Sequence, residues 1–256
     1  MKFGVCCDID KLPLLQKCGY DYIELNFSNM ALADEKKFEE MCEQIGHYGL
    51  SAESFNCFFP AGFNLNVDVD YDKIREYAKK GFARAELLGG KIAVLGSGGA
   101  RRVPEGYDRV LAAEQFVKVL RICGDIAAKH GMQIAIEPLR TAETNFINTV
   151  AEGIEMCKAV DHESVKCLVD FFHLFMNGET LDAVKNSGEL IIHTHLARPN
   201  ADRRIPTVQD RDTCAQWASA LKSIGYDGRM SLEGDFTPDF ETAIREVQPV
   251  LELFRS

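Results

Sequence analysis

Long apolar runs are missing from this sequence. Its 256 residues contain no stretch that approaches the roughly 18 consecutive apolar residues of a membrane-spanning helix. A secretory signal shows an apolar segment of roughly 7–15 residues near the start, yet this chain reaches Asp8 and Asp10 without one. We therefore expect no membrane partner and a cytoplasmic location.

Positive charge is also scarce. The chain has 29 Lys and Arg residues against 39 Asp and Glu residues, which gives a net charge of −10. Nucleic-acid binding depends on clustered Lys and Arg side chains that contact phosphates. We therefore expect no nucleic-acid partner.

Cysteine pairs at CxxC spacing are absent, although the chain has nine cysteines. The number is odd, and a chain of this length needs no disulfides to fold. Cys123 and Cys167 lie within apolar patterns, where a thiol packs as a small hydrophobic group. We expect reduced thiols throughout, and we expect Cys6 and Cys7 to pack, since neither has an evident histidine partner.

The sequence does show a regular alternation of two kinds of segment. Short stretches rich in β-branched residues recur, and most are followed by apolar residues at helical spacing. The predicted strands are residues 3–6, 22–25, 51–55, 92–95, 133–137, 167–170, 190–195 and 229–233. This alternation predicts a parallel sheet, and eight repeats in about 250 residues favour an α/β fold closed into a (β/α)₈ TIM barrel. We expect residues 1–256 to form one domain.

Signals for helix ends support this interpretation. Thr237 is predicted to cap the last helix, with Pro238 in the first turn and an apolar stripe from Phe240 to Phe254. Other predicted helices are followed by a glycine just before the next strand, as at Gly19, Gly49, Gly131, Gly188 and Gly225.

Four polar residues lie at the carboxyl ends of the last four predicted strands: Glu137, Asp170, His195 and Glu233. Side chains alternate between the two faces of a strand. If apolar neighbours such as Ile192 and Leu232 point outward, the four polar side chains point into the barrel mouth, where such barrels hold their active sites. Any one of them alone could be an ordinary strand-end residue bonded to a loop, but four in succession favour a shared site.

Burying three carboxylates and an imidazole together is costly unless a cation neutralises them. We therefore predict one divalent metal ion held by Glu137, Asp170, His195 and Glu233. This oxygen-rich set of ligands suits Mn²⁺ best, while Mg²⁺, Co²⁺ and Zn²⁺ stay open.

These same segments resemble a known family, the xylose isomerase-like sugar phosphate isomerases and epimerases. Residues 136–149 are similar to its strand-5 motif, and Asp170-Phe171-Phe172-His173 resembles its Asp-x-x-His motif. His193-Thr194-His195 resembles its His-x-His segment, and residues 225–233 resemble its last-strand signature. The similarity spans nearly the whole chain and points to the D-tagatose 3-epimerase and hydroxypyruvate isomerase branch.

The resemblance implies the same four metal ligands. It also implies substrate contacts from Glu143, His173 and an arginine that follows His195. The segment after His195 departs from the family pattern, because it is about two residues longer and lacks a glycine. Arg203 is our prediction for the substrate contact, with Arg204 as the alternative.

The implied activity is isomerisation or epimerisation of a small keto-sugar or related hydroxy-carbonyl compound. Glu137 and Glu233 would be the catalytic pair: one removes a proton beside the carbonyl, and the other returns a proton from the opposite face, through a cis-enediolate that the cation stabilises. A metal-dependent lyase or dehydratase acting on an inosose or oxo-sugar is the alternative, because it uses the same chemistry. The sequence leaves both a monomer and a homo-oligomer open.

A nuclease of the endonuclease IV type, which shares the barrel, is a poor fit. Its three-metal site needs many histidines, whereas this chain has six, and the net charge of −10 opposes nucleic acid. A binding protein without catalysis is also disfavoured, because such a protein would have no need to keep all four predicted metal ligands.

Other residues carry weaker signals. His193 is predicted to lie one layer deeper than His195 and to support the site, while Glu24 and Glu53 are predicted to point into the same mouth. Phe58, Phe59 and Phe63 fit a wall over the substrate, a subunit contact or simple packing. The glycine-rich segment 96–102 offers Arg101 and Arg102 for an anionic substrate group, without matching a phosphate-loop motif.

Overall fold

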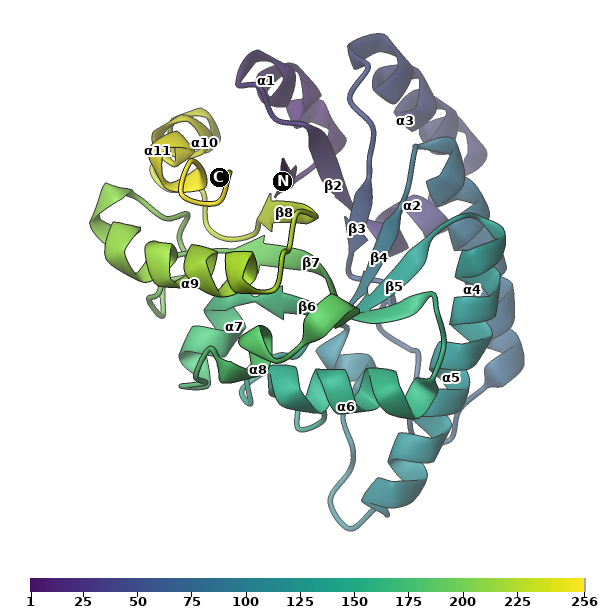
Figure 1. Ribbon diagram of the computed structural model, residues 1–256. Helices are drawn as coiled ribbons and strands as arrows, with labels where there is room; N and C mark the ends of the chain where they lie inside the picture. Colours follow the sequence, from purple (N-terminus) through teal and green to yellow (C-terminus); the bar gives the residue numbers. More distant parts are fainter. Residues whose placement is uncertain (256) are drawn as a thin grey trace.

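The computed structural model describes residues 1–255 and shows a closed barrel of parallel strands (Figure 1). In chain order the strands are β1 (Lys2–Cys6), β2 (Tyr22–Asn26), β3 (Ser54–Asn56), β4 (Ile92–Leu95), β5 (Gln133–Ile136), β6 (Val165–Asp170), β7 (Ile191–Leu196) and β8 (Arg229–Leu232). Each strand pairs with its sequence neighbours, and β8 closes the barrel onto β1. The predicted (β/α)₈ fold is confirmed.

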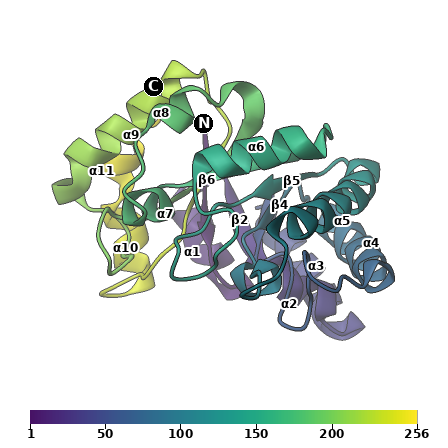
Figure 2. The ribbon, with the colours of Figure 1, turned by 90° about the horizontal axis from the view of Figure 1, so that it is seen from below.

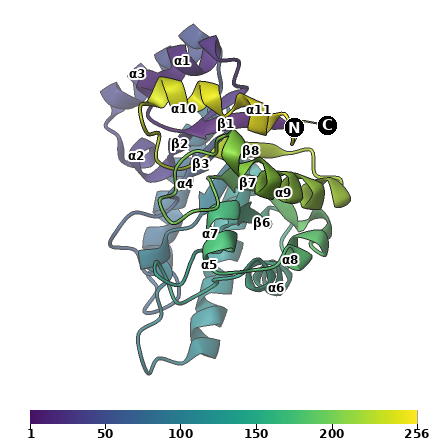
Figure 3. The same ribbon diagram turned by 90° about the vertical axis from the view of Figure 1, so that its left-hand side faces the viewer.

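Helices surround this barrel, as Figure 2 shows from below. They are α1 (Leu12–Lys17), α2 (Phe27–Leu32), α3 (Glu35–Tyr48), α4 (Tyr71–Leu87), α5 (Arg109–Lys129), α6 (Val150–Val160), α7 (Phe171–Met176), α8 (Asp182–Lys185), α9 (Arg211–Ser223), α10 (Phe240–Glu246) and α11 (Gln248–Leu251). Figure 3 places the two chain ends near each other, where α11 passes β1 and β8. Within residues 1–255 we find no helix long and apolar enough to span a membrane.

Local sequence signals account for most helix ends. The side chains of Asp34, Asp70 and Asp108 each accept a backbone N–H at the start of α3, α4 and α5. Thr149 and Glu152 form a reciprocal capping box at the start of α6. All five glycines predicted to end helices have positive φ angles, a conformation that costs a residue with a Cβ atom more than it costs glycine.

The last helix differs from its prediction. Asp239, not Thr237, is its N-cap, because the Asp239 carboxylate accepts the Thr242 N–H at 2.9 Å while the Thr237 hydroxyl bonds to Asp235. The predicted single helix is also divided at Val247 into α10 and α11. Pro249 lies in the first turn of α11, where its missing N–H is tolerated, although it could not lie inside a continuous helix.

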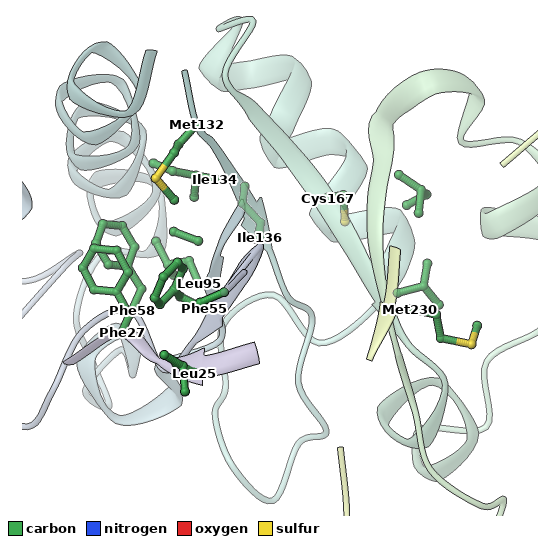
Figure 4. Close-up of a cluster of buried hydrophobic side chains, with 14 of the residues drawn as sticks. Leu25, Phe27, Phe55, Phe58, Leu95, Met132, Ile134, Ile136, Cys167 and Met230 are labelled. Carbon is green, nitrogen blue, oxygen red and sulfur yellow. The ribbon is translucent and has the colours of Figure 1, made fainter. Parts of the chain in front are cut away.

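The main hydrophobic core lies between the barrel and its helices, and Figure 4 shows part of it. Phe27 and Phe58 pack edge to face with ring centroids 4.6 Å apart. Phe59 is 5% exposed, and Phe63 packs against Tyr77 with ring centroids 4.9 Å apart. Of the three roles considered for this aromatic segment after β3, the structure shows packing.

A second, smaller apolar cluster fills part of the barrel interior. It contains Ile92, Val94, Ala135 and Leu168, with Ile192 packed against it. The prediction that Ile192 faces outward is wrong. The register between β6 and β7 shifts at this point, so that Cys167 pairs with Ile191 and Leu168 with His193, and the extra residue turns inward.

The prediction that Glu53 points into the barrel mouth is also wrong. It precedes β3, which begins at Ser54, three residues later than predicted. Its carboxylate bonds to Lys2 Nζ at 2.7 Å and to Arg229 Nε at 2.6 Å, at the strand-start end of the barrel. Glu53 is thus a structural ion pair at the end of the barrel opposite to the predicted site.

Candidate metal centre and active site

The four predicted metal ligands come together at the carboxyl ends of β5 to β8. Each of Glu137, Asp170, His195 and Glu233 offers one ligand atom, and these atoms all lie within 4.8 Å of one another. Asp170 ends β6 and His195 lies within β7, while Glu137 and Glu233 directly follow β5 and β8. Parallel strands of one barrel end at the same rim, which explains why residues so far apart in sequence converge.

The imidazole of His195 lies at the centre of this cluster and is fully buried. Its Nδ1 atom lies 3.2 Å from Glu137 Oε1 and 3.0 Å from Glu233 Oε2. Asn56, at the end of β3, donates to the other oxygen of Glu233 at 2.9 Å. Three carboxylates and one imidazole nitrogen facing one another are a donor set that suits a divalent cation.

Arg203 supplies positive charge to this cluster. Its Nη2 atom lies 2.8 Å from Asp170 Oδ2 and 2.7 Å from Glu233 Oε2, and its guanidinium lies 4.8 Å from the Phe172 ring centroid. Arg204 instead pairs with Asp202 and is 47% exposed. Of the two predicted arginines, Arg203 is therefore the one that reaches the site.

The backbone holds Arg203 in place. It adopts a left-handed conformation, with φ of 51°, and its carbonyl accepts the Asp235 N–H at 2.8 Å. A Cβ atom on Gly234 would lie 2.2 Å from that carbonyl oxygen, so only glycine permits the approach. The segment after β7 is thus fixed against the segment after β8.

The pKa values of Glu137 and Glu233 are shifted in opposite directions. Burial raises the pKa of Glu137, and the nearby Glu233 charge adds to this rise. Burial also disfavours the charged form of Glu233, but the cations of His195 and Arg203 outweigh it and hold the pKa of Glu233 below its usual range. Two glutamates at one imidazole therefore have different proton affinities.

The residues predicted to contact substrate lie beside the cluster. The backbone N–H of Arg140 donates to His173 Nδ1 at 3.3 Å, so that Nε2 carries the proton of a neutral ring. That Nε2 lies 3.5 Å from Asp170 Oδ2 and 4.0 Å from Glu143 Oε2. Arg140, which sequence reasoning missed, holds Glu143 through a 2.7 Å contact from Nε to Oε1.

Arg101 takes a role different from the anion contact considered for it. It is fully buried, and its guanidinium donates to the backbone oxygens of Leu95 and Glu137, at 3.4 Å and 2.6 Å. Gly96 contributes space, because a Cβ atom there would lie 2.2 Å from Glu137 Oε2. Both residues of the glycine-rich segment therefore position Glu137.

Glu24, which the sequence predicted to point into the barrel mouth, is a buried partner of His195. Glu24, on β2, is 1% exposed, and its Oε1 atom lies 2.9 Å from His195 Nε2. The prediction that Cys6 has no histidine partner is wrong, since its sulfur lies within 4.8 Å of ligand atoms of Glu24 and His195. Burial raises the pKa of the Cys6 thiol. No local signal identifies the contacts with His195, because they join β7 to strands at the other end of the sequence, β1 and β2.

Comparisons with known proteins identify the family of this chain. The chain belongs to the family of xylose isomerase-like TIM barrels, whose model matches residues 12–252. D-psicose 3-epimerase of Agrobacterium fabrum is 33% identical over 234 residues, which cover 85% of this chain and 75% of that protein. The D-psicose 3-epimerase of Ruminiclostridium cellulolyticum is 31% identical over 121 residues, only 47% of this chain and 40% of that protein.

Solved structures share the fold. A crystal structure of D-psicose 3-epimerase in the presence of D-fructose matches with a TM-score of 0.85 at 18% identity, covering 100% of this chain and 98% of that one. A crystal structure of IOLI protein with a zinc atom matches with a TM-score of 0.77 at 21% identity, covering 99% and 98%. These likenesses establish the architecture, and the curated relatives are by name sugar epimerases and isomerases, among them the inosose isomerase of Bacillus subtilis.

Proposed function

We propose that this chain is a divalent-metal-dependent epimerase of a small keto-sugar, acting at the carbon beside the keto group. The observation that carries the proposal is the placement of Glu137 and Glu233. Both carboxylates lie at the same nitrogen of His195, yet they come from β5 and β8, three places apart around the barrel. The names of the relatives, D-psicose 3-epimerases, favour epimerisation over aldose–ketose isomerisation.

Glu137, Asp170, His195 and Glu233 would hold the metal ion. Their donor atoms suit Mn²⁺ best, with Mg²⁺, Co²⁺ and Zn²⁺ as further candidates. A bound divalent ion would polarise the substrate carbonyl and stabilise the negative charge of an enediolate.

The two glutamates would move the proton. One carboxylate removes the proton from the carbon beside the carbonyl, and the electron pair moves onto the carbonyl oxygen to give the cis-enediolate. The other glutamate, in its protonated form, returns a proton to the opposite face of the same carbon, and the carbonyl is restored. The pKa of Glu137 is raised and that of Glu233 is lowered, so Glu137 holds a proton more readily than Glu233 does.

Glu143, His173 and Arg203 would hold the sugar. The protonated Nε2 of His173 and the carboxylate of Glu143 offer a donor and an acceptor on one side of the cluster. Arg203 contacts Asp170 and Glu233, and from there its guanidinium could bond to the oxygen that gains negative charge.

A substrate panel with controlled metal tests the proposal. The protein is freed of metal with a chelator, and D-psicose, D-fructose, D-tagatose, an inosose and hydroxypyruvate are each incubated with added Mn²⁺. We expect interconversion of 3-epimeric ketoses that stops on chelation and returns with Mn²⁺. Turnover that continues unchanged in the presence of the chelator would contradict the proposal that catalysis needs a metal ion. Loss of water from the inosose, without epimerisation, would favour the dehydratase alternative.

A further inference from the structure

Glu24 is a carboxylate in the interior of the barrel, on the side opposite to β6. Both of its oxygens are bonded. Oε1 lies 2.9 Å from His195 Nε2, while Oε2 lies 2.7 Å from His193 Nε2 and 2.5 Å from Ser231 Oγ. Neither imidazole is exposed, and Glu24 itself is 1% exposed. These contacts leave Glu24 with no route to the sugar, so its influence on the site must pass through His195.

The residues around Glu24 hold it in one orientation. Tyr22, also fully buried, has its hydroxyl 2.8 Å from Ser231 Oγ, and the Ser231 hydroxyl in turn donates to Glu24. His193 is fixed at its other nitrogen, where Nδ1 lies 3.1 Å from the Arg229 carbonyl oxygen. Gly4 leaves room for the Tyr22 ring, because a Cβ atom on residue 4 would lie 2.3 Å from that ring. The Glu24 carboxylate is thus held from several strands.

The two nitrogens of His195 face different partners. A carboxylate only accepts hydrogen bonds, so the proton of a neutral His195 ring next to Glu24 lies on Nε2. Nδ1 is the atom that faces Glu137 and Glu233, at 3.2 Å and 3.0 Å, and a divalent ion held there would take the place of any proton on it. Only an unprotonated nitrogen can bind a metal ion. Without Glu24, the carboxylates of Glu137 and Glu233 would draw the proton to Nδ1 and block it.

We propose that Glu24 is a positioning residue that keeps the proton of His195 on Nε2, so that Nδ1 is available to a divalent ion. The inference rests on the proposed function, because it concerns the same metal centre. A partner of this kind orients the imidazole and raises its strength as a ligand. Glu24 acts through His195, and it is not itself a metal ligand.

Metal affinity of two matched variants tests this role. Glu24→Met removes both acceptor oxygens at similar volume, and Glu53→Met does the same to a carboxylate at the other end of the barrel. Titration of metal-free protein with MnCl₂ in a calorimeter should show affinity weakened by roughly 10- to 100-fold in Glu24→Met. Glu53→Met should bind Mn²⁺ like the wild type. Glu24→Gln, which keeps one acceptor oxygen, should recover part of the loss.

A second measurement needs no variant of Glu24. Zn²⁺ is diamagnetic, so ¹⁵N NMR of histidine-labelled wild-type protein with ZnCl₂ reports which nitrogen of His195 carries the proton, with the signal assigned by its loss in His195→Gln. We expect a proton on Nε2 that exchanges slowly with solvent, and an unprotonated, metal-bound Nδ1. A proton on Nδ1 would overturn the proposal.

The outcomes separate the inference from the proposed function. If the wild type binds neither Mn²⁺ nor Zn²⁺, the metal-dependent function fails and the role of Glu24 falls with it. If the wild type binds Mn²⁺ and Glu24→Met binds it equally well, only the inference fails. A lower melting temperature in Glu24→Met with unchanged Mn²⁺ affinity would show a purely structural role and would also overturn it.

Discussion

The guanidinium of Arg203 lies 2.7 Å from the carboxylate of Glu233, Nη2 to Oε2. The same nitrogen reaches Asp170 Oδ2 at 2.8 Å, so one cation joins side chains from the ends of β6 and β8. Asp170 is 2% exposed. Partly buried ion pairs are screened by salt less than exposed ones, and this pair orients both carboxylates. Arg203 therefore compensates negative charge in the site, and we propose that it also contacts the substrate.

We expect Arg203→Met to lower kcat/KM for the epimerised ketose by roughly 10²- to 10³-fold, because a donor aimed at developing negative charge is lost. Arg204→Met is the matched control. Its side chain is 47% exposed and pairs with Asp202, away from the metal ligands, so activity should stay within about twofold of the wild type. Steady-state kinetics at saturating Mn²⁺ measure both. Equal losses of activity in the two variants would contradict a specific role of Arg203 in catalysis.

Glu137→Gln and Glu233→Gln should each abolish exchange of the sugar α-proton with D₂O, because each variant lacks one member of the proton-transferring pair. Exchange is followed by ¹H NMR, with bound Mn²⁺ verified by elemental analysis so that metal loss is not mistaken for loss of the base. Glu53→Gln, at the opposite end of the barrel, should exchange normally. Normal exchange in either site variant would exclude that glutamate from the proton transfer.

Gly96→Ala should disturb Glu137, since the added methyl would lie 2.2 Å from Oε2 and force the carboxylate to move. We expect weaker Mn²⁺ binding and roughly 10²-fold lower activity, the cost of a misplacement of about 1 Å at a reacting group. Gly99→Ala is the control in the same segment, because a Cβ atom there meets nothing within 4 Å. Wild-type affinity in Gly96→Ala would show that Glu137 can move without harm.

Glu179 should make stability depend on pH. Burial raises the pKa of its carboxyl to about 7, and the nearby Glu152 charge adds to this. Because the pKa in the folded state exceeds that of the unfolded chain, the protonated form stabilises the fold at low pH. This stabilisation is lost as pH rises from about 4.5 to about 7.

Glu179→Gln stays neutral and keeps an oxygen to accept the Val150 N–H, which bonds to Glu179 Oε2 at 2.8 Å. Relative to the wild type it should gain about 1 kcal/mol at pH 8, after allowance for solvent screening, and nothing at pH 4. Thermal unfolding at the two pH values measures this difference. The same gain at both would show that ionisation of Glu179 is not its cause.

Periodicity and position in the sequence predicted much of this protein. The alternation of β-branched and helical segments predicted the barrel, because those patterns reflect local backbone preferences and the need to bury one face of each element. The barrel in turn brought Glu137, Asp170, His195 and Glu233 together, since the ends of parallel strands meet at one rim. That these four bind metal stays a prediction from the sequence and the family.

Other features depended on distances that no local pattern contains. Glu24 on β2 meets His195 on β7 across 171 residues of sequence. Ile192 turned inward because of a bulge against β6, and Glu53 moved to the other end because β3 begins later than its pattern indicated. Side-chain periodicity determines which residues face the barrel interior, but register and strand length determine which of them meet. Those are set only when all eight strands close into one barrel.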